Sequence, residues 1–428
     1  MSDTRESKSV AVIGTLDTKS AEIKYIAQSL ESQGIGAVTI DSGILGAGTF
    51  TPTITREAVA EAAGMTLEAV KAAGSRGAAV EHMQRGLRSI VPALAAAGRI
   101  HGAICLGGAE GGLLGAAAMH DLPIGFPKLI VSPSASGRRE FGPFVGSTDM
   151  LVMHSVIDIL GMNSLAISVF DNAVAAMTGM VLFAGRPPVT KGMSVGITML
   201  GQTTPGAAVM REMLEHEGYE PIVFHANGVG GPAMDALAAQ GGLHGVVEYT
   251  VSEIANSVRN GIHATGPERM RAAAVRGLPL LVVPGAADFF NQGPRDTVPS
   301  EYAGRAQYFH NPVATLVRMS RDEMREVGRR LAAVVNEARG PVQVLIPSRG
   351  LSLIGVAGGA IHDEAADAAL TEELRSAVRD PAVVEVVDLD INDPAFGRLA
   401  ARRFIQLDIA STQQAVRDTA GTARKDAT

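Results

Sequence analysis

The segment Val10-Ala-Val-Ile-Gly-Thr-Leu-Asp-Thr-Lys-Ser20 has the pattern of a β-strand, a turn and the start of a helix. Its first four residues form an apolar run, which predicts a buried parallel strand that Gly14 ends. The hydroxyl and carboxylate side chains that follow are typical of helix N-termini, so we expect a helix from about Ala21. Apolar residues recur at helical spacing on that segment: Ile23, Ile26, Ala27 and Leu30.

A second apolar run, residues 37–40, predicts the next strand, and Asp41 stands at its C-terminal tip. A strand, turn, helix and strand followed by an acid is the layout of a mononucleotide-binding half, in which the acid can accept hydrogen bonds from ribose hydroxyls. The alternative is that Asp41 caps the following turn. The three-glycine dinucleotide fingerprint and the Gly-Lys-Ser/Thr phosphate loop are both missing here, so a phosphate would be held in another way.

Length and composition indicate two layered domains. A chain of 428 residues exceeds one ordinary core. Its hydrophobic content of 46% with only 4% aromatic residues fits buried parallel strands. The predicted fold class is α/β, with two Rossmann-like three-layer domains and mostly parallel sheets. We expect a nucleotide (ATP)-binding domain over 1–186, a second domain with a small-molecule site over 192–410, and a flexible tail over 411–428.

Charge and cysteine content exclude several classes of partner. The net charge of −7 and the lack of a long basic run argue against nucleic-acid binding. One cysteine, Cys105, permits no disulfide within the chain, which suits the cytoplasm. It lies in an apolar run and is interpreted as a buried small hydrophobe. We expect no membrane-spanning segment, and we read 150–160 and 164–183 as apolar helices of a soluble core.

A glycine cluster, Gly107-Gly-Ala-Glu-Gly-Gly112, follows the next predicted strand. Glycines let backbone N–H groups converge, and the helix that follows adds its positive end, so the loop suits a phosphate or carboxylate. The alternative is that the glycines permit close packing of helix on sheet. A hydroxyl-rich loop that begins at Ser132 follows a further strand. Such loops gather at the carboxyl edge of a parallel sheet, where open α/β folds bind ligands.

The candidate nucleotide site therefore combines these loops. Its residues are Gly14, Thr15, Asp17, Thr18, Lys19, Asp41, Gly107, Gly108, Glu110, Gly111, Gly112 and Ser132. Lys19 is the cation of the first turn, where the helix dipole disfavours a positive charge unless an anion offsets it. Asp17 and a nucleotide phosphate are the two partners considered for Lys19, and phosphate is the favoured one.

A second strand-first unit begins near Val195 and repeats the order strand, hydroxyl-rich turn, helix, strand and glycine-rich loop. This order suggests an internal duplication. Polar residues again follow its strands and predict a second pocket, composed of His225, Asn227, Gly228, Glu248, Asp288, His310 and Asn311. Two histidines and two acids among them could ligate a metal, but they lack close ligand spacing. A hydrogen-bonding pocket is therefore preferred, and no metal site is predicted.

Several motifs resemble one known family. Val12-Ile-Gly-Thr-Leu-Asp-Thr-Lys-Ser20 is similar to its opening Val-Gly-Thr-x-Asp-Thr-Lys-Gly, and Leu106-Gly-Gly-Ala-Glu-Gly-Gly112 to its Gly-Gly-Ser-Gly-Gly loop. Phe224-His-Ala-Asn-Gly-Val-Gly-Gly231 resembles Phe-His-Ala-Thr-Gly-x-Gly-Gly. Further similar blocks are Asp296-Thr-Val-Pro299, His310-Asn-Pro312 and Ile391-Asn-Asp-Pro-Ala-Phe396. The family is that of the N-terminal ATP-binding domain of the tobamovirus-resistance protein (Tm-one), which also has bacterial and fungal members.

The resemblance implies two Rossmann-like subdomains, ATP binding in the first of them, and assembly into a homodimer or tetramer. In the plant protein a TIM-barrel-type domain follows. Because this chain stops before such a domain, a separate TIM-barrel partner protein is expected. Inhibition of viral replication belongs to the plant branch and is not carried over. Two departures concern the second domain: Asn227 replaces the family's Thr, and Ser348-Arg-Gly-Leu351 replaces Pro-Glu-Gly-Gly.

The leading hypothesis is an ATP-binding two-domain protein that has a metabolic role on a small molecule, with Mg²⁺ accompanying the ATP. One alternative is an ATP-dependent kinase or ligase for a carboxylate- or sugar-like substrate, for which Asp17 and Glu110 are the nearby acids. Another is a non-catalytic regulatory or scaffolding module that works with the TIM-barrel partner. The sequence leaves open whether the protein is an enzyme.

Overall fold

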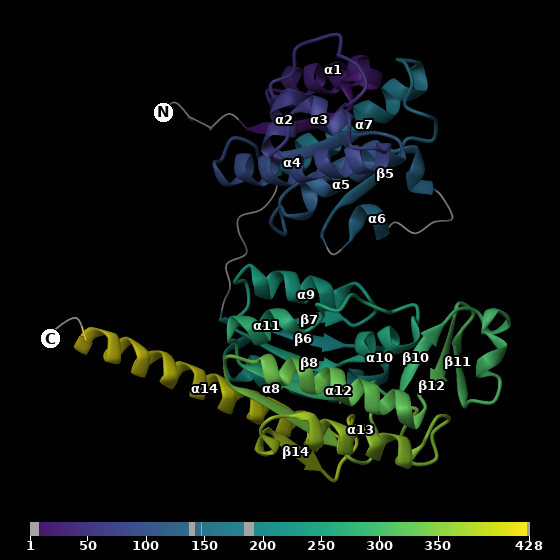
Figure 1. Ribbon diagram of the computed structural model, residues 1–428, viewed down its shortest axis with the longest axis vertical. Helices are drawn as coiled ribbons and strands as arrows, with labels where there is room; N and C mark the ends of the chain where they lie inside the picture. The colour runs from purple at the N-terminus through teal and green to yellow at the C-terminus, as the bar shows by residue number, and fades with distance from the viewer. Residues whose placement is uncertain (1–7, 137–141, 147, 184–191, 426–428) are drawn as a thin grey trace. The chain divides into compact units, whose positions relative to one another are not determined.

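The structure is a computed structural model that describes residues 8–136, 142–146, 148–183 and 192–425 (Figure 1). The chain divides into two compact units, Met1–Val189 and Thr190–Thr428. This division falls inside the segment at 184–192 that the sequence indicated as the domain boundary, most of which lies outside the described residues. Each unit is considered by itself below.

The first unit contains a five-stranded parallel sheet with the strand order β2-β1-β3-β4-β5. Its strands are β1 (Ser9–Gly14), β2 (Gly36–Asp41), β3 (Gly102–Leu106), β4 (Lys128–Ser132) and β5 (Leu151–His154). This is the order 2-1-3-4-5 of doubly wound α/β folds. The register of β1 and β2 places Gly14 beside Asp41, so the first two predicted loops leave the sheet at the same edge.

Helices cover both faces of this sheet because the buried strands alternate their side chains between two cores. Val10 and Val12 face the core formed with α1 (Leu16–Ser32) and α7 (Ser164–Phe183). Ala11 and Ile13 face the core formed with α4 (Arg76–Ala96) and α5 (Ala109–His120). The remaining short helices are α2 (Arg56–Ala62), α3 (Leu67–Lys71), η1 (Pro133–Ser136) and α6 (Gly142–Val145).

One sequence-based assignment in the first unit needs correction. Residues 150–160 do not form a helix: Leu151–His154 is β5, which pairs with β4 at the edge of the sheet. A short apolar run does not by itself distinguish strand from helix, and pairing with β4 decided it. Among the described residues, α7 is apolar and long enough to span a membrane, and 39% of the 18-residue stretch that meets this criterion is buried. Phe170, Val174 and Met177 of α7 pack against the sheet, as in a core helix.

The second unit repeats the strand order of the first and extends it by one strand. Its six parallel strands have the order β14-β13-β9-β8-β6-β7. When these strands are numbered 1 to 6 along the chain, with β6 as the first, and read from β7, the order is 2-1-3-4-5-6. These strands are β6 (Met193–Met199), β7 (Tyr219–His225), β8 (Gly245–Thr250), β9 (Leu280–Gly285), β13 (Val342–Pro347) and β14 (Val384–Val387). The predicted fold class, α/β with two mostly parallel sheets, is confirmed.

An antiparallel sheet is inserted between β9 and α12 (Arg321–Glu337), which the sequence analysis did not predict. Its strands are β10 (Phe289–Gln292), β11 (Gln307–Asn311) and β12 (Ala314–Arg318), in the order β10-β12-β11. This sheet projects from one side of the unit (Figure 1). It supplies the side chains of β10 and β12 to the interior, including the fully buried Phe289 and Phe290.

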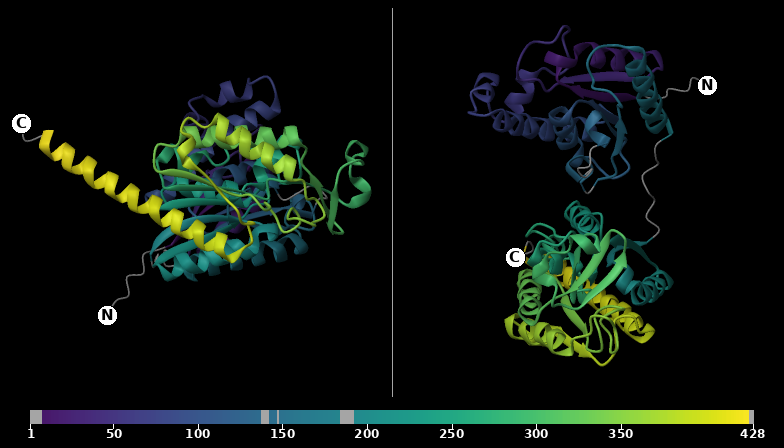
Figure 2. Two further views of the ribbon diagram at one scale, coloured as in Figure 1. Left: turned by 90° about the horizontal axis from the view of Figure 1, so that it is seen from below. Right: turned by 90° about the vertical axis from the view of Figure 1, so that its right-hand side faces the viewer.

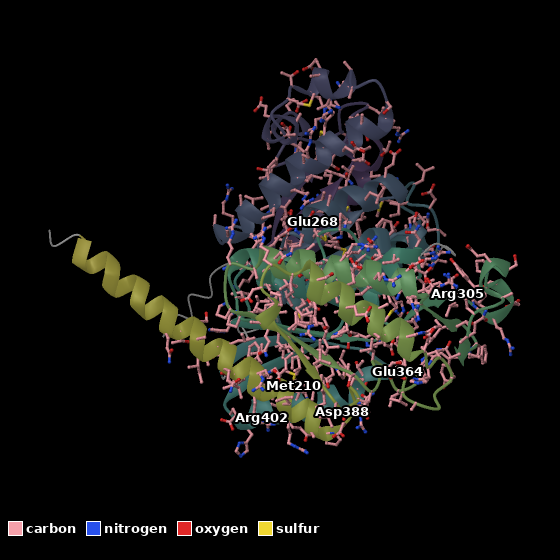
Figure 3. All side chains as sticks on the ribbon, turned by 60° about the horizontal axis from the view of Figure 1, so that its bottom comes forward. Met210, Glu268, Arg305, Glu364, Asp388 and Arg402 are labelled. Atoms are coloured by element: carbon pink, nitrogen blue, oxygen red, sulfur yellow. The ribbon has the colours of Figure 1, made fainter. Side chains whose placement is uncertain are left out.

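Helices also cover both faces of the second sheet (Figure 2). One face packs against α8 (Thr204–His216) and α14 (Pro394–Lys425), and Met210 of α8 is fully buried there (Figure 3). The other face packs against α9 (Gly230–Ala239), α10 (Ser252–Arg259), α11 (Arg271–Arg276), α12 and α13 (Glu364–Ala377). The short 3-10 helices are η2 (Gly201–Thr203), η3 (Arg295–Thr297), η4 (Ser300–Tyr302) and η5 (Pro381–Val383).

The C-terminal segment, which the sequence predicts to be a flexible tail over 411–428, is helical as far as Lys425. Helix α14 continues to Lys425, and its last turns extend beyond the rest of the unit (Figures 1 and 2). Residues 426–428 lie outside the described residues. The first turns of α14 are anchored by the buried Phe396, Ala400 and Phe404.

Candidate functional site

The first unit has a cavity of about 470 Å³ where the connections from β1 and β3 separate. The two strands are neighbours, but their following helices, α1 and α5, cover opposite faces of the sheet. That divergence opens a crevice at the carboxyl edge, which is where open α/β sheets bind ligands. The polar lining residues are Thr15, Asp17, Thr18, Lys19, Ser42, Arg76, Glu110 and Asp158, with Gly108 and Gly111 of the glycine loop.

The structure therefore brings together most of the residues that the sequence placed in the nucleotide site. Those that line the cavity are Thr15, Asp17, Thr18, Lys19, Gly108, Glu110 and Gly111. Those that do not line it are Gly14, Asp41, Gly107, Gly112 and Ser132. The second group has identifiable structural roles, which are described next.

Asp41 holds the turn rather than facing the cavity. Its Oδ1 accepts hydrogen bonds from the backbone N–H groups of Leu16, at 3.0 Å, and Gly43, at 2.8 Å. The side chain is buried, and this burial raises the pKa of the carboxyl group above its usual value, although the two N–H groups oppose the rise. Asp41 thus fastens the start of α1 to the loop after β2. This arrangement corresponds to the alternative role, and it corrects the expectation that Asp41 joins the other site residues.

Three of the predicted glycines serve packing. A Cβ atom on Gly107 would lie 2.5 Å from the Cα of Gly111, and one on Gly112 would lie 2.5 Å from the ring of Phe144. On Gly14 it would lie 2.4 Å from the side chain of Ile23. By contrast, a Cβ on Gly108 meets no atom within 4 Å, because this residue faces open space at the start of α5. The packing alternative therefore holds for part of the cluster, and the cavity is bordered by the rest.

Ser132 is fully buried at the end of β4, and its Oγ accepts a hydrogen bond from the Ser134 N–H at 3.2 Å. This bond closes the turn after the strand. The hydroxyl-rich composition of that loop is therefore explained by turn formation.

Lys19 lines the cavity, but its partner in the protein is neither of the two considered. Its Nζ donates a 2.5 Å hydrogen bond to the backbone carbonyl of Ile159, and its backbone departs from helical geometry, with φ −133° and ψ 26°. Asp17 has a separate role, because its Oδ2 accepts from the Leu45 N–H at 2.9 Å. The ammonium group is thus placed at the cavity by a neutral carbonyl, which leaves its charge uncompensated by that partner.

Two further positively polarised groups border the cavity, although Asp17, Glu110 and Asp158 add negative charge to its lining. The first-turn N–H groups of α5 have no partner within the helix, and they carry the positive end of its dipole. Arg76, at the start of α4, lies 2.6 Å from Glu110 of α5 in an exposed ion pair. Sequence reasoning missed Arg76, Ser42 and Asp158. The available signal for Ser42 was its position directly after Asp41, whereas only the tertiary fold brings the other two to this edge.

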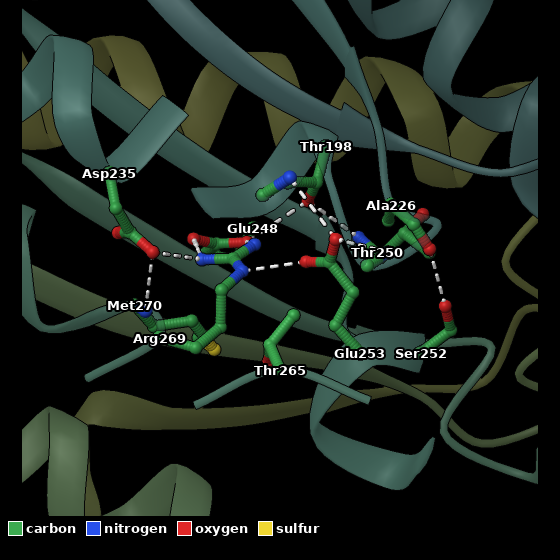
Figure 4. A network of polar contacts seen from close by, with 12 residues as sticks. Thr198, Ala226, Asp235, Glu248, Thr250, Ser252, Glu253, Thr265, Arg269 and Met270 are labelled. Atoms are coloured by element: carbon green, nitrogen blue, oxygen red, sulfur yellow. Dashed lines mark hydrogen bonds and ion pairs between the residues drawn. The ribbon is translucent and has the colours of Figure 1, made fainter. Parts of the chain in front are cut away.

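The predicted pocket of the second unit is not assembled. Glu248 belongs to a buried network centred on Arg269 (Figure 4). Arg269 Nη1 and Nη2 donate to the two Glu248 oxygens at 2.6 and 2.7 Å, and Nε donates to Glu253 at 2.6 Å. Asp235 accepts from Nη1 at 3.1 Å. Burial raises the pKa of Glu248 to about 7 although Arg269 opposes the rise.

Gly228 joins this network, because its N–H donates to Glu253 at 2.9 Å. The other predicted residues of that pocket lie outside it, and Asp288 accepts from the Ser352 hydroxyl at 2.7 Å. Asn227 and Asn311 each accept from the backbone N–H two residues later, which closes local turns. His225 and His310 are exposed. In the described part of the chain, no cluster of three or more His, Cys, Asp or Glu residues could hold a metal ion.

The corresponding crevice of the second unit is occupied by its own side chains. Thr203, after β6, and Thr250, after β8, share a 2.6 Å hydrogen bond between their hydroxyl groups. The loop after β13 closes over them, since the Leu353 N–H donates to the Gln202 carbonyl at 3.0 Å and Ile354 packs in a small apolar cluster.

Fold and site define a protein of two doubly wound α/β units, the first with a polar cavity at its topological switch point. Residues 8–185 match the N-terminal domain, and residues 192–408 the C-terminal domain, of the Uncharacterised protein family (UPF0261). The chain belongs to this family.

Relatives extend over nearly the whole chain. A UPF0261 protein of Clostridium tetani is 37% identical over 403 residues, covering 94% of this chain and 99% of that protein. The ToMV resistance protein Tm-1(GCR237) of Solanum lycopersicum is 35% identical over 339 residues, covering 78% of this chain and 45% of that protein. The resemblance drawn from the motifs is therefore confirmed.

Among solved structures, a UDP-N-acetylglucosamine 2-epimerase is 11% identical with a TM-score of 0.21, covering 65% of this chain and 79% of that one. At this score the likeness contributes nothing to the assignment of function.

Proposed function

We propose that the first unit binds ATP in the cavity between the loops after β1 and β3. The observation that carries the proposal is the position of this cavity at the switch point of a 2-1-3-4-5 sheet, bordered by a cation and by a helix N-terminus. Its volume of about 470 Å³ lies within the usual range of small-molecule sites.

The lining suggests how the nucleotide is divided between polar and apolar surfaces. Lys19, Arg76 and the first-turn N–H groups of α5 are suited to the phosphates. Ile44, Val80, Met83 and Leu114 offer apolar contacts for the base. Asp17, Asp158 and Glu110 are carboxylates in the same lining, and one of them could ligate an Mg²⁺ ion that is otherwise held by phosphate oxygens.

Calorimetric titration of the full chain with ATP and Mg²⁺ tests the proposal. Arg76→Met is expected to weaken ATP binding about tenfold, because a hydrogen bond to a charged group contributes roughly 1.5–3 kcal/mol. Arg85→Met is the matched control: Arg85 is an exposed arginine on the same helix and does not line this cavity. No heat of binding with the wild-type chain, or equal losses in the two variants, would contradict the proposal.

Turnover of bound ATP would support a metabolic role on a small molecule. It would also support the alternative of a kinase or ligase. Asp17 and Glu110 already accept from Leu45 and Arg76, so neither acid is a free base in this state. Phosphate release from ATP, measured with and without a panel of carboxylates and sugars, separates an enzyme from a module that only binds nucleotide. Release that rises with one compound supports the enzyme, and no release supports the scaffolding alternative.

Assembly and location stay predictions with their own measurements. A homodimer or tetramer is checked by light scattering, and the TIM-barrel partner by copurification from cell extract. The cytoplasmic location is checked by fractionation.

A further inference from the structure

We propose that Ser42 is the residue that reads the sugar of the bound nucleotide, an inference that rests on ATP binding in the first-unit cavity. It assigns to Ser42 the contact that the sequence suggested for Asp41. The assignment comes from three independent features of the structure: the state of the Ser42 hydroxyl, the rigidity of its backbone, and its place in the fold.

The hydroxyl group of Ser42 is buried and unused. The residue is 1% exposed, and within the described residues its Oγ has no hydrogen-bond partner. Ser42 is nevertheless one of the residues that line the cavity. Leaving a buried polar group unpaired costs stability, and such groups are therefore uncommon unless they have a partner in another state.

The backbone around Ser42 is held on both sides. Its own N–H donates to the Gly14 carbonyl at 2.9 Å, which joins it to the end of β1. The next N–H, of Gly43, donates to the Asp41 carboxylate, which also holds the start of α1. Oδ1 of Asp41 therefore holds the backbone next to Ser42 in place. This division of roles explains why an acid and a hydroxyl follow β2 together.

The place of Ser42 in the fold identifies the group that it meets. Ser42 directly follows β2, and residues at the tip of this strand contact the ribose in mononucleotide-binding halves. The phosphate-binding features, Lys19 and the start of α5, come instead from the loops after β1 and β3. Ser42 Oγ is thus assigned a hydrogen bond to a ribose hydroxyl, in which either oxygen can act as donor.

Binding of ATP, 2′-deoxy-ATP and 3′-deoxy-ATP is compared for the wild-type chain and for Ser42→Ala. The wild type is expected to bind at least one deoxy analogue about three- to tenfold more weakly, the effect of one neutral hydrogen bond. Ser42→Ala should lose the same factor for ATP and bind that analogue and ATP equally, as expected when both changes remove one interaction.

Thr178→Val is the matched control. The Thr178 hydroxyl is also buried without a partner in the described chain, but it lies in α7 and does not line this cavity. This variant should discriminate between the nucleotides as the wild type does. The melting temperature of each nucleotide-free variant is measured as well, and Ser42→Ala should melt no lower than the wild type, because it removes an unpaired group.

The outcomes separate this inference from the proposed function. If the wild type binds ATP but Ser42→Ala retains its discrimination, or if the wild type does not discriminate, the role of Ser42 is refuted and ATP binding stands. If the wild type binds none of the three nucleotides, the proposed function fails and the assignment of Ser42 falls with it.

Discussion

The buried Arg269 shows how strongly single residues are constrained in the second unit. Its guanidinium is 2% exposed and bonded to Glu248, Glu253 and Asp235 (Figure 4). Glu253 also receives the N–H groups of Gly228 and Gly231, so the network ties α10 to the glycine-rich loop after β7. The role of this loop, which resembles a family motif, is therefore partly structural.

Arg269→Met is expected to lower the free energy of unfolding of the second unit by about 3–5 kcal/mol, because it leaves buried carboxylates without their counter-charge. Urea unfolding measures the change. Arg271→Met is the control, since the ion pairs of Arg271 with Glu268 and Glu337 are exposed to solvent and contribute little to stability. A change in Arg269→Met as small as in the control would contradict the importance of the network.

A second buried arginine, Arg318, predicts a pH dependence of stability. Burial raises the pKa of Asp367 to about 7, although Arg318 lies 2.6 Å away and opposes the rise, and the Asp288 carboxylate adds to it. The unfolded value is about 3.9. Between about pH 4 and 7, Asp367 is therefore protonated in the folded chain and ionised in the unfolded chain. The contribution of Asp367 is fully present below about pH 4, and it is lost as the pH rises through 7.

We expect Asp367 to lower the stability of the second unit by at most about 1.4 kcal/mol per pH unit across that range, and Glu248, whose pKa is also raised, adds to the slope. Asp367→Asn does not titrate and should reduce this slope in urea unfolding experiments. Asp322→Asn, at a side chain that is 90% exposed, should leave it unchanged. An identical slope in wild type and Asp367→Asn would show that Asp367 does not cause the dependence.

Lys19 gives a test of the phosphate contact at the same scale. Its Nζ is held at the cavity by the Ile159 carbonyl. If phosphate is its partner in the complex, Lys19→Met should weaken ATP binding about tenfold and adenosine binding hardly at all, with a smaller loss at high salt. Titrations with the two ligands at two salt concentrations measure this. Equal losses for ATP and adenosine would remove Lys19 from the site.

At the scale of elements, the glycine loop before α5 combines two functions. Gly107 and Gly112 permit the loop and helix to pack, whereas Gly108 and Gly111 border the cavity. The two cavity glycines lie between the two packing glycines in a short segment, so composition alone does not separate them. Only the positions of the surrounding atoms, such as the Phe144 ring beside Gly112, assign each residue.

Gly108→Val should weaken ATP binding about tenfold or more and leave stability nearly unchanged, because its side chain would enter open space at the cavity. Gly112→Val should instead lower stability. Its side chain must displace the Phe144 ring, which destabilises the first unit by about 1–3 kcal/mol. Titration with ATP and thermal unfolding are measured for both. Normal ATP binding by Gly108→Val would show that the loop does not approach the nucleotide.

Arg349 shows how a departure from the family pattern is accommodated at the ends of two strands. It follows β13 and forms two 2.6 Å hydrogen bonds with Asp388, which follows β14 and is labelled in Figure 3. Both side chains are largely exposed. The replacement of an acid by a base is thus matched by a local ion pair, outside the networks of Arg269 and Arg318.

At the scale of the whole molecule, each unit has its own apolar cores. The residues of each core cluster come from one unit alone, with Val12 and Ile13 in the first and Val246 and Val247 in the second. We therefore expect Met1–Val189 and Thr190–Thr428 to fold when they are expressed separately.

The first half should unfold cooperatively and bind ATP within about threefold of the affinity of the full chain. Saturation at 100 times the dissociation constant should stabilise it by about 2.7 kcal/mol and leave the second half unchanged. Calorimetry and thermal unfolding of both halves test this. A first half that folds but binds no ATP, while the full chain binds it, would place part of the site elsewhere.

Much of the architecture followed from local patterns in the sequence. Apolar runs separated by helical periodicity indicated two α/β units, and glycine and hydroxyl clusters marked the strand ends where the cavity lies. These signals are local because burial on both faces makes a strand apolar and because turn residues act on their own backbone. The short strand β5 and the antiparallel insertion were missed: β5 and β10 pair with strands more distant along the chain, and the local hairpin of β11 and β12 was not recognised.

The tertiary structure alone decided which polar residues share a site. Asp41 and Ser42 are adjacent in sequence. The Asp41 carboxylate accepts hydrogen bonds from two backbone N–H groups, whereas Ser42 is a lining residue of the cavity. Glu248 and Asp288 both follow the predicted pattern, but Arg269 and Ser352 engage them separately. Their partners come from distant segments of the chain. The sequence therefore determined the fold class and the edge of the sheet, and the approach of those segments determined the site.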